Sequence, residues 1–151
     1  MSLTCYYQNM INSKTSIEPS AKADIMRILA RNIEPHAEIL FSYLHGSFLA
    51  GDSPKDIDIG VYLSRIPDSP LNYELNLEVA LSDAVRILPV DVRVLNSAPL
   101  PFQYAVLKDG IPLVVNDEEA RCAFQERTIM RYFDFEPFLR RYLEEAFRVA
   151  V

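Results

Sequence analysis

One stretch of the sequence, residues 44–63, constrains the fold and the chemistry of this chain more than any other. It reads as an apolar run, a turn formed by Gly46 and Ser47, a short polar spacer, and then apolar residues at every second position from Ile57 onward. Alternation with a period of two predicts a strand with one buried face. Because Asp56 and Asp58 lie two positions apart at its start, we expect their side chains to leave the same face of the strand.

The neighbouring carboxylates and the turn predict a site for a divalent cation and for phosphate. Asp56 and Asp58 would repel each other, and a cation between them would offset that repulsion. Mg²⁺ is the expected ion, because it prefers oxygen ligands and keeps waters or substrate phosphates as its remaining ligands. Gly46 allows a close approach of the backbone and Ser47 offers a hydroxyl, as a phosphate-binding turn requires.

The order of these features resembles the DNA-polymerase-β-type nucleotidyltransferases, in which a Gly-Ser turn and a short spacer precede Asp-x-Asp on a strand. Members of that superfamily carry a third carboxylate on a later strand. Asp91 matches it, because residues 89–95 place valines at alternate positions and Asp91 on the opposite face. Three carboxylates on adjacent strands suit nucleotidyl transfer with two Mg²⁺ ions. The alternative is a surface turn followed by an edge strand with solvated acids, which the ordered set disfavours.

A narrower resemblance extends from about residue 21 to the end of the chain. The segments 90–99, 104–110 and 132–142 look like those of the minimal nucleotidyltransferases. These proteins are commonly paired with a small helical HEPN-type toxin, a ribonuclease, and are understood to neutralise it by adenylylating a toxin tyrosine with ATP. The resemblance implies phosphate binding by Gly46 and Ser47, and metal binding and catalysis by Asp56, Asp58 and Asp91.

Composition narrows the possible partners. The chain has 151 residues and a net charge of −6, and its lysines and arginines form no cluster. A nucleic-acid substrate would require a basic face, so we expect no direct nucleic-acid binding. No apolar run is long enough to span a membrane, and Cys5 and Cys122 have no metal-binding spacing, so we expect a cytoplasmic protein with reduced thiols.

The order of elements predicts an α/β or α+β domain with a mixed sheet flanked by helices, which is the fold that the resemblance implies. We expect one domain over residues 1–151, with a poorly defined segment at 1–20 and a helical tail at 117–151 packed on the domain. The expected strands cover residues 39–44, 57–63, 89–95 and 112–115. Expected helices run from a Ser20 cap to near Asn32, from a Ser69 cap with Pro70 in the first turn to Pro89, and over 102–107.

The helical tail carries an apolar stripe from Phe135 to Phe147 with opposite-charge pairs on its other side. Packing into the core is the simpler interpretation of this stripe, and a partner surface is the second. A homo-oligomer also stays open from the sequence. We expect His45 to pack beside the turn and Asp52 to be a turn residue. Lys55 is expected at the surface, with a phosphate contact as the alternative.

Three functions remain open from the sequence. The first is an adenylyltransferase that modifies a protein, namely the tyrosine of a HEPN toxin. The second is a nucleotidyltransferase that modifies a small molecule such as an antibiotic, which would normally need a further substrate-binding domain. The third is an antitoxin that acts by binding alone. The set of three carboxylates disfavours the third, because a repelling acidic cluster has no evident benefit without metal chemistry.

Overall fold

A four-stranded mixed sheet lies at the centre of the molecule. The computed structural model describes residues 16–51 and 53–149, so the expectations for Cys5, for Asp52 and for most of segment 1–20 lie outside the described residues. The spatial order of the strands is β3-β2-β1-β4, in which β1 is antiparallel to β2 and β4, and β2 is parallel to β3. The four strands are β1 (Ile39–His45), β2 (Ile57–Leu63), β3 (Val90–Val94) and β4 (Ile111–Val115). The predicted mixed sheet is thus confirmed.

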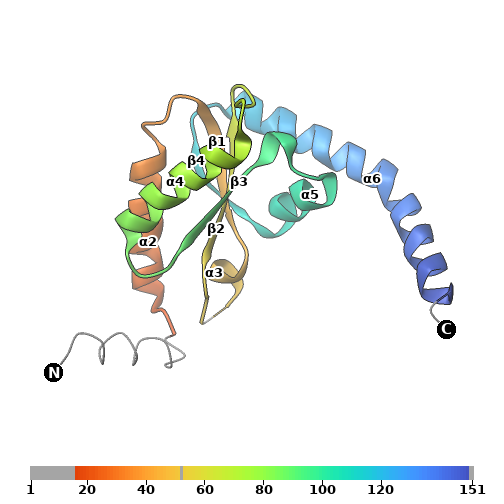
Figure 1. Cartoon of the computed structure of the whole chain (residues 1–151), viewed down its shortest axis with the longest axis horizontal. Helices are drawn as coiled ribbons and strands as arrows, with labels where there is room; N and C mark the ends of the chain where they lie inside the picture. The colour runs from red at the N-terminus through yellow and green to blue at the C-terminus, as the bar shows by residue number, and fades with distance from the viewer. Residues whose placement is uncertain (1–15, 52, 150–151) are drawn as a thin grey trace.

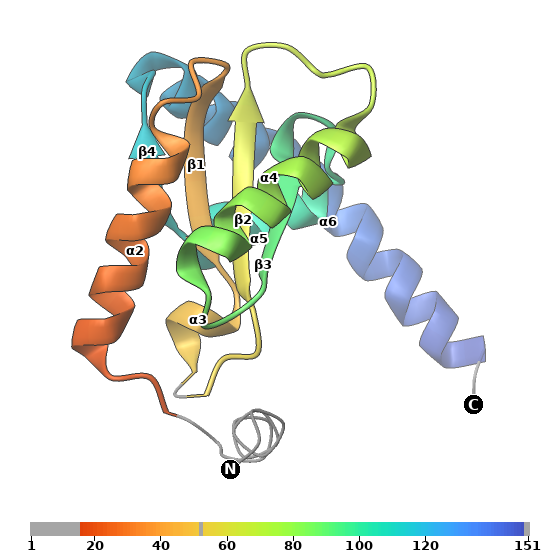
Figure 2. The same cartoon turned by 60° about the vertical axis from the view of Figure 1, so that its left-hand side comes forward.

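Helices cover both faces of this sheet (Figures 1 and 2). Helices α2 (Pro19–Ile33) and α4 (Pro70–Val85) pack on the face that holds the larger core cluster. Helix α5 (Leu100–Asp109) and the first part of α6 (Glu118–Val149) cover the other face. Two short pieces, α3 (Ser47–Ala50) and a 3₁₀ turn over Leu95–Ser97, follow β1 and β3. None of the described helices is long and apolar enough to cross a membrane.

The alternation in the sequence decides which side chains the sheet buries. Ile57, Ile59 and Val61 of β2 are fully buried against α2 and α4, as the period-two pattern predicts. Each such side chain stabilises the fold by about 1.5–3 kcal/mol relative to an exposed one. The intervening residues of β2, Asp58 among them, therefore face α5, and this second face carries the polar site.

Side chains of helix α4 bond to the backbone at the free edge of β3, an arrangement that we call the seal of β3. Every second backbone N–H of an edge strand lacks a partner within the sheet, and three side chains at successive turns of α4 accept hydrogen bonds from these groups. The pairs are Val90 N to Ser82 Oγ at 3.0 Å, Val92 N to Glu78 Oε1 at 3.0 Å, and Val94 N to Glu74 Oε1 at 2.9 Å. The seal fixes both glutamates beside β3.

The predicted cap at Ser69 is confirmed, and two other predicted helix ends are wrong. Ser69 accepts a hydrogen bond from Asn72 N at 3.3 Å and so caps α4. Asp117 caps α6 in the same way, by accepting a hydrogen bond from Ala120 N at 2.9 Å. Ser20 is no cap, because α2 begins one residue earlier with Pro19 in its first turn. Helix α4 ends at Val85 rather than at Pro89, since Arg86 adopts a left-handed conformation with φ of 64°.

The C-terminal helix forms as predicted, but its distal half does not pack in the core. Phe124 and Thr128 are buried. The C-terminal part of α6, in contrast, extends away from the sheet in both views (Figures 1 and 2). Pro137 lies inside α6 and has no N–H to donate. The core interpretation of the stripe is wrong for its exposed members, which we call the distal α6 face: Phe135, Phe138, Tyr142, Leu143 and Phe147.

Candidate active site

The Gly46–Ser47 turn lies where β1 passes into α3. Gly46 has φ of 79°, in the region that favours glycine, and a Cβ atom on it would lie 2.1 Å from Asp58 Oδ2. No side chain larger than hydrogen fits there unless Asp58 moves. The turn and the Asp58 carboxylate are therefore in direct contact, as the predicted site requires.

A row of three polar side chains crosses the sheet beside this turn. His45 of β1 pairs with Asp58 of β2, and Asp58 pairs with Asp91 of β3. Laterally paired residues point to the same face of a sheet, so all three face α5. Asp56 lies just before β2 and at the start of the same face. The sheet register thus gathers His45, Asp56, Asp58 and Asp91 at one place.

The charges of these groups influence one another. The pKa of Asp58 is raised, first by burial and then by the negative charges of Asp56 and Asp91, while Arg93 opposes the shift. Asp56 and Asp91 are therefore close enough to Asp58 to disfavour its ionised form, and a bound cation would offset that cost. Burial lowers the pKa of His45, although Asp91 opposes the shift, so the site favours the neutral imidazole.

Two polar atoms of the row are buried without a hydrogen bond, Asp91 Oδ1 and His45 Nε2. The nearest cation to Asp91 is Arg93, whose Nε lies 3.5 Å from Oδ1. An unsatisfied carboxylate oxygen beside two further carboxylates has the donor chemistry that Mg²⁺ prefers. Among the described residues, however, no group of three or more His, Cys, Asp and Glu side chains is arranged so that it could hold a metal ion. A cation bound there would need further ligands from another molecule.

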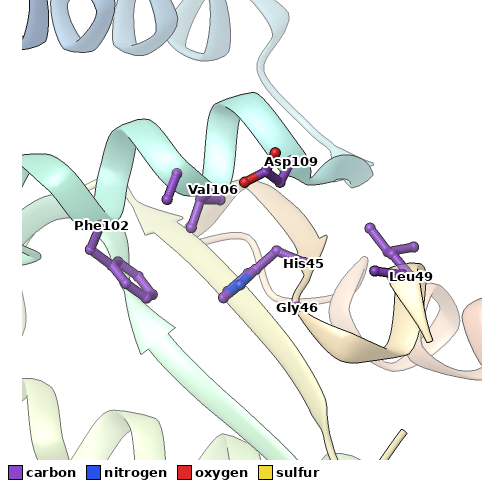
Figure 3. Close-up of a pocket in the computed structure, with 8 residues that line it drawn as sticks. His45, Gly46, Leu49, Phe102, Val106 and Asp109 are labelled. Atoms are coloured by element: carbon purple, nitrogen blue, oxygen red, sulfur yellow. The ribbon is translucent and has the colours of Figure 1, made fainter. Parts of the chain in front are cut away.

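A pocket of about 540 Å³ opens beside the row, between the turn and α5 (Figure 3). The ring of His45 points toward Phe102, with ring centroids 5.5 Å apart in an edge-to-face arrangement. Leu49, Val106 and Asp109 complete the labelled lining. The pocket begins at Gly46, so a molecule held by the turn can continue into an apolar cavity.

Sequence reasoning missed two residues of this region. Arg93 follows Asp91 by two positions on the same face of β3 and is the only described cation in contact with it; that spacing was a usable signal. The sequence predicts a helix that contains Phe102, but nothing in it shows that α5 folds back over His45. Lys55 is exposed, as expected.

Comparison with known proteins agrees with this geometry. Residues 23–119 match the family model described as polymerase beta, nucleotidyltransferase. No curated protein sequence gives a significant match. A crystal structure of a toxin–antitoxin with AMP-PNP contains a similar chain, with a TM-score of 0.70 and 21% identity over 81% of this chain and 98% of that one.

A second similar chain comes from tri-AMPylated Shewanella oneidensis HEPN toxin in complex with MNT antitoxin, with a TM-score of 0.65 and 22% identity over 87% of this chain and 99% of that one. A third comes from the toxin–antitoxin MntA–HepT, with a TM-score of 0.64, 22% identity, and coverage of 86% and 99%. At these identities, the likeness establishes the shared fold.

Proposed function

The chain belongs to the polymerase beta nucleotidyltransferase family, and we propose that it transfers AMP from ATP to a tyrosine hydroxyl of a HEPN-type toxin and thereby acts as an antitoxin. The observation that carries the proposal is the gathering of Asp56, Asp58 and Asp91 beside the Gly46–Ser47 turn. The similar structures support it, since one contains AMP-PNP and another an AMPylated HEPN toxin.

Each residue has a defined task in this proposal. Asp56 and Asp58 would hold one Mg²⁺ together with the triphosphate, and Asp91 would share a second. Bound there, Mg²⁺ would offset the carboxylate repulsion and polarise the phosphate oxygens. Backbone N–H groups at the turn and the Ser47 hydroxyl would hold the β- and γ-phosphates. Any larger residue in place of Gly46 would displace the Asp58 carboxylate from the turn, because its Cβ would lie 2.1 Å from Asp58 Oδ2.

The proposed transfer is a single displacement that needs no covalent enzyme intermediate. The acceptor oxygen forms a bond to the α-phosphorus while the bond from that phosphorus to the α–β bridging oxygen breaks. Pyrophosphate leaves, and the hydroxyl proton passes to water. The chain contributes orientation and charge, which are the main sources of catalysis in phosphoryl and nucleotidyl transfer.

A protein acceptor agrees with the charge and the surface of the molecule. The net charge of −6 disfavours a polyanionic acceptor such as nucleic acid. The distal α6 face leaves large apolar side chains exposed, as a surface for a partner protein would. The same face also keeps the binding-only antitoxin as a second candidate, which the following experiment separates from the first.

The decisive experiment incubates the protein with labelled ATP, Mg²⁺ and a HEPN-type toxin, and then measures the intact mass of both proteins. We expect one or more AMP groups on the toxin, none without a divalent cation and none with Asp56→Ala. Asp83→Ala, an exposed aspartate on α4 away from the site, serves as the matched control and should retain transfer. A bound but unmodified toxin would support the binding-only function. In a parallel incubation with a small hydroxylated amine, transfer of AMP to that molecule while the toxin stays unmodified would support an antibiotic-type enzyme.

A further inference from the structure

A groove of about 380 Å³ runs along the free edge of β3, on the side of the carboxylate row away from the Gly46–Ser47 turn. Helix α4 forms one wall, and Figure 2 shows this helix crossing in front of β2 and β3. The lining residues are Asp56, Leu71, Glu74, Leu75, Glu78, Pro89, Val90, Asp91 and Arg93. Two of the three site carboxylates thus belong to the groove as well, and we call it the α4 groove.

The direction of the reaction places the acceptor on this side. In nucleotidyl transfer the attacking and leaving oxygens lie in line on opposite sides of the α-phosphorus. The Gly46–Ser47 turn is beside β1, and the row of carboxylates continues from there through Asp58 to Asp91. If the turn holds the departing phosphates, the hydroxyl must approach from the Asp91 end, where the α4 groove opens.

The α4 groove presents apolar side chains that the fold does not use. Leu71 and Leu75 are 60% and 48% exposed, although they are one helical turn apart and border the same hollow. Glu74 and Glu78 beside them are held by the β3 backbone, so they cannot fold over the leucines. A partner that covered these two side chains would gain about 25 cal/mol for each Å² of apolar surface removed from water.

The charge of the groove further limits the class of molecule that can bind in it. Four carboxylates line it, those of Asp56, Glu74, Glu78 and Asp91, against the single guanidinium of Arg93. A polyanion would be repelled, and a neutral or basic group would be attracted. A cationic, hydroxyl-rich small molecule would match the charge but has little apolar surface to pack against Leu71 and Leu75. A protein segment can supply both positive charge and apolar side chains.

From these observations we propose that the α4 groove seats the acceptor segment of the partner protein. Leu71 and Leu75 would pack against apolar side chains that flank the modified hydroxyl, and the acidic lining would attract a segment of net positive charge. The hydroxyl would then enter at Asp91, opposite the leaving pyrophosphate. This inference rests on the proposed function and adds to it the surface that selects the acceptor.

The test compares wild-type protein with the double variant Leu71→Lys/Leu75→Lys, which keeps helix-forming residues at exposed positions and adds positive charge to the groove. Val79→Lys is the matched control, because Val79 is 62% exposed on the same helix but does not line the groove. With a HEPN-type toxin as acceptor, we expect kcat/KM for the toxin to fall at least ten-fold in the double variant. The rise in Tm caused by ATP and Mg²⁺ should stay unchanged, and Val79→Lys should behave as wild type.

Three results would overturn the inference. The first is a kcat/KM in the double variant within two-fold of wild type, which leaves the proposed function standing and removes only the groove. The second is an equal loss in Val79→Lys, which would show that any lysine on α4 disturbs the enzyme. The third is a wild-type protein that modifies no toxin under any condition, and in that case the proposed function fails as well.

Discussion

Replacement of Gly46 by alanine tests the contact between the turn and the carboxylate row. The new Cβ would lie 2.1 Å from Asp58 Oδ2 and 2.9 Å from Asp58 Cγ, so the carboxylate must leave its position. With φ of 79° and ψ of −159°, Gly46 lies in a region that is essentially confined to glycine and costs another residue about 1–3 kcal/mol. Overpacking a well-packed site costs about 1–3 kcal/mol. We expect a loss of about 3 kcal/mol, or roughly 6–12 °C in Tm for a chain of this length.

The assay is thermal unfolding with and without ATP and Mg²⁺. Gly46→Ala should lower Tm and also lose the ligand-induced rise in Tm, because Asp58 is displaced. Gly51→Ala at the other end of α3 is the matched control. Its φ of −112° suits any residue, and its Cβ would lie 3.1 Å from Ser47 O, a far milder contact than the one at Gly46, so we expect a smaller loss of about 1 kcal/mol.

A double-mutant cycle identifies the cause. If the clash with Asp58 is responsible, Asp58→Ala should recover about 1–3 kcal/mol of the loss in the Gly46→Ala background and leave only the cost of the positive φ. Effects of Gly46→Ala and Asp58→Ala that simply add would refute the reasoning, since the two residues would then not interact.

Two further predictions concern charge and the distal helix. Asp58→Asn should abolish transfer but raise Tm in metal-free buffer at pH 7. The pKa of Asp58 is raised in the folded state, so the wild-type protein loses stability relative to the variant as pH rises above 3.8. A difference in Tm that grew toward acid pH would contradict this prediction. Phe147→Ala and Tyr142→Ala, at side chains 71% and 68% exposed, should change the free energy of unfolding by less than about 0.5 kcal/mol. Each substitution should weaken toxin binding by about 2 kcal/mol, measured by calorimetry. Met130→Ala is the control, because Met130 is also apolar and exposed. Equal losses of stability and affinity would show that Phe147 and Tyr142 pack within the monomer.

The sheet and the carboxylate row could be predicted because both follow from local alternation. Ile57, Ile59 and Val61 had to share the buried face, which left Asp58 on the other, and the valines around Asp91 repeat that logic. Lateral pairing then aligns the two aspartates with no further information. The helix caps at Ser69 and Asp117 are equally local, since each side chain bonds to a backbone N–H three residues later.

Features that depend on pairs of distant elements could not be predicted in this way. The seal of β3 by Glu74 and Glu78 requires α4 to lie along one particular edge, and the sequence shows only two acids one turn apart on a helix. The contact between His45 and Phe102 likewise depends on where α5 returns to the sheet. The left-handed Arg86 ended α4 early, although a non-glycine residue gives no local signal for that conformation.

The distal α6 face shows most clearly what a periodic pattern leaves open. An apolar stripe indicates that one side of a helix is covered, but it does not show whether the core of the same chain or a partner protein covers it. A short helical segment that leaves the body of the protein has little stability of its own in water, and Phe138, Tyr142 and Phe147 gain nothing while they remain exposed. A small-molecule acceptor could not cover a face of this size, whereas a helical protein could pack along it. The exposed distal α6 face therefore favours a protein partner, as the acidic α4 groove with its two leucines does, and the two arguments use different residues. The distal α6 face would hold the partner, and the α4 groove would present the partner's hydroxyl to the carboxylates.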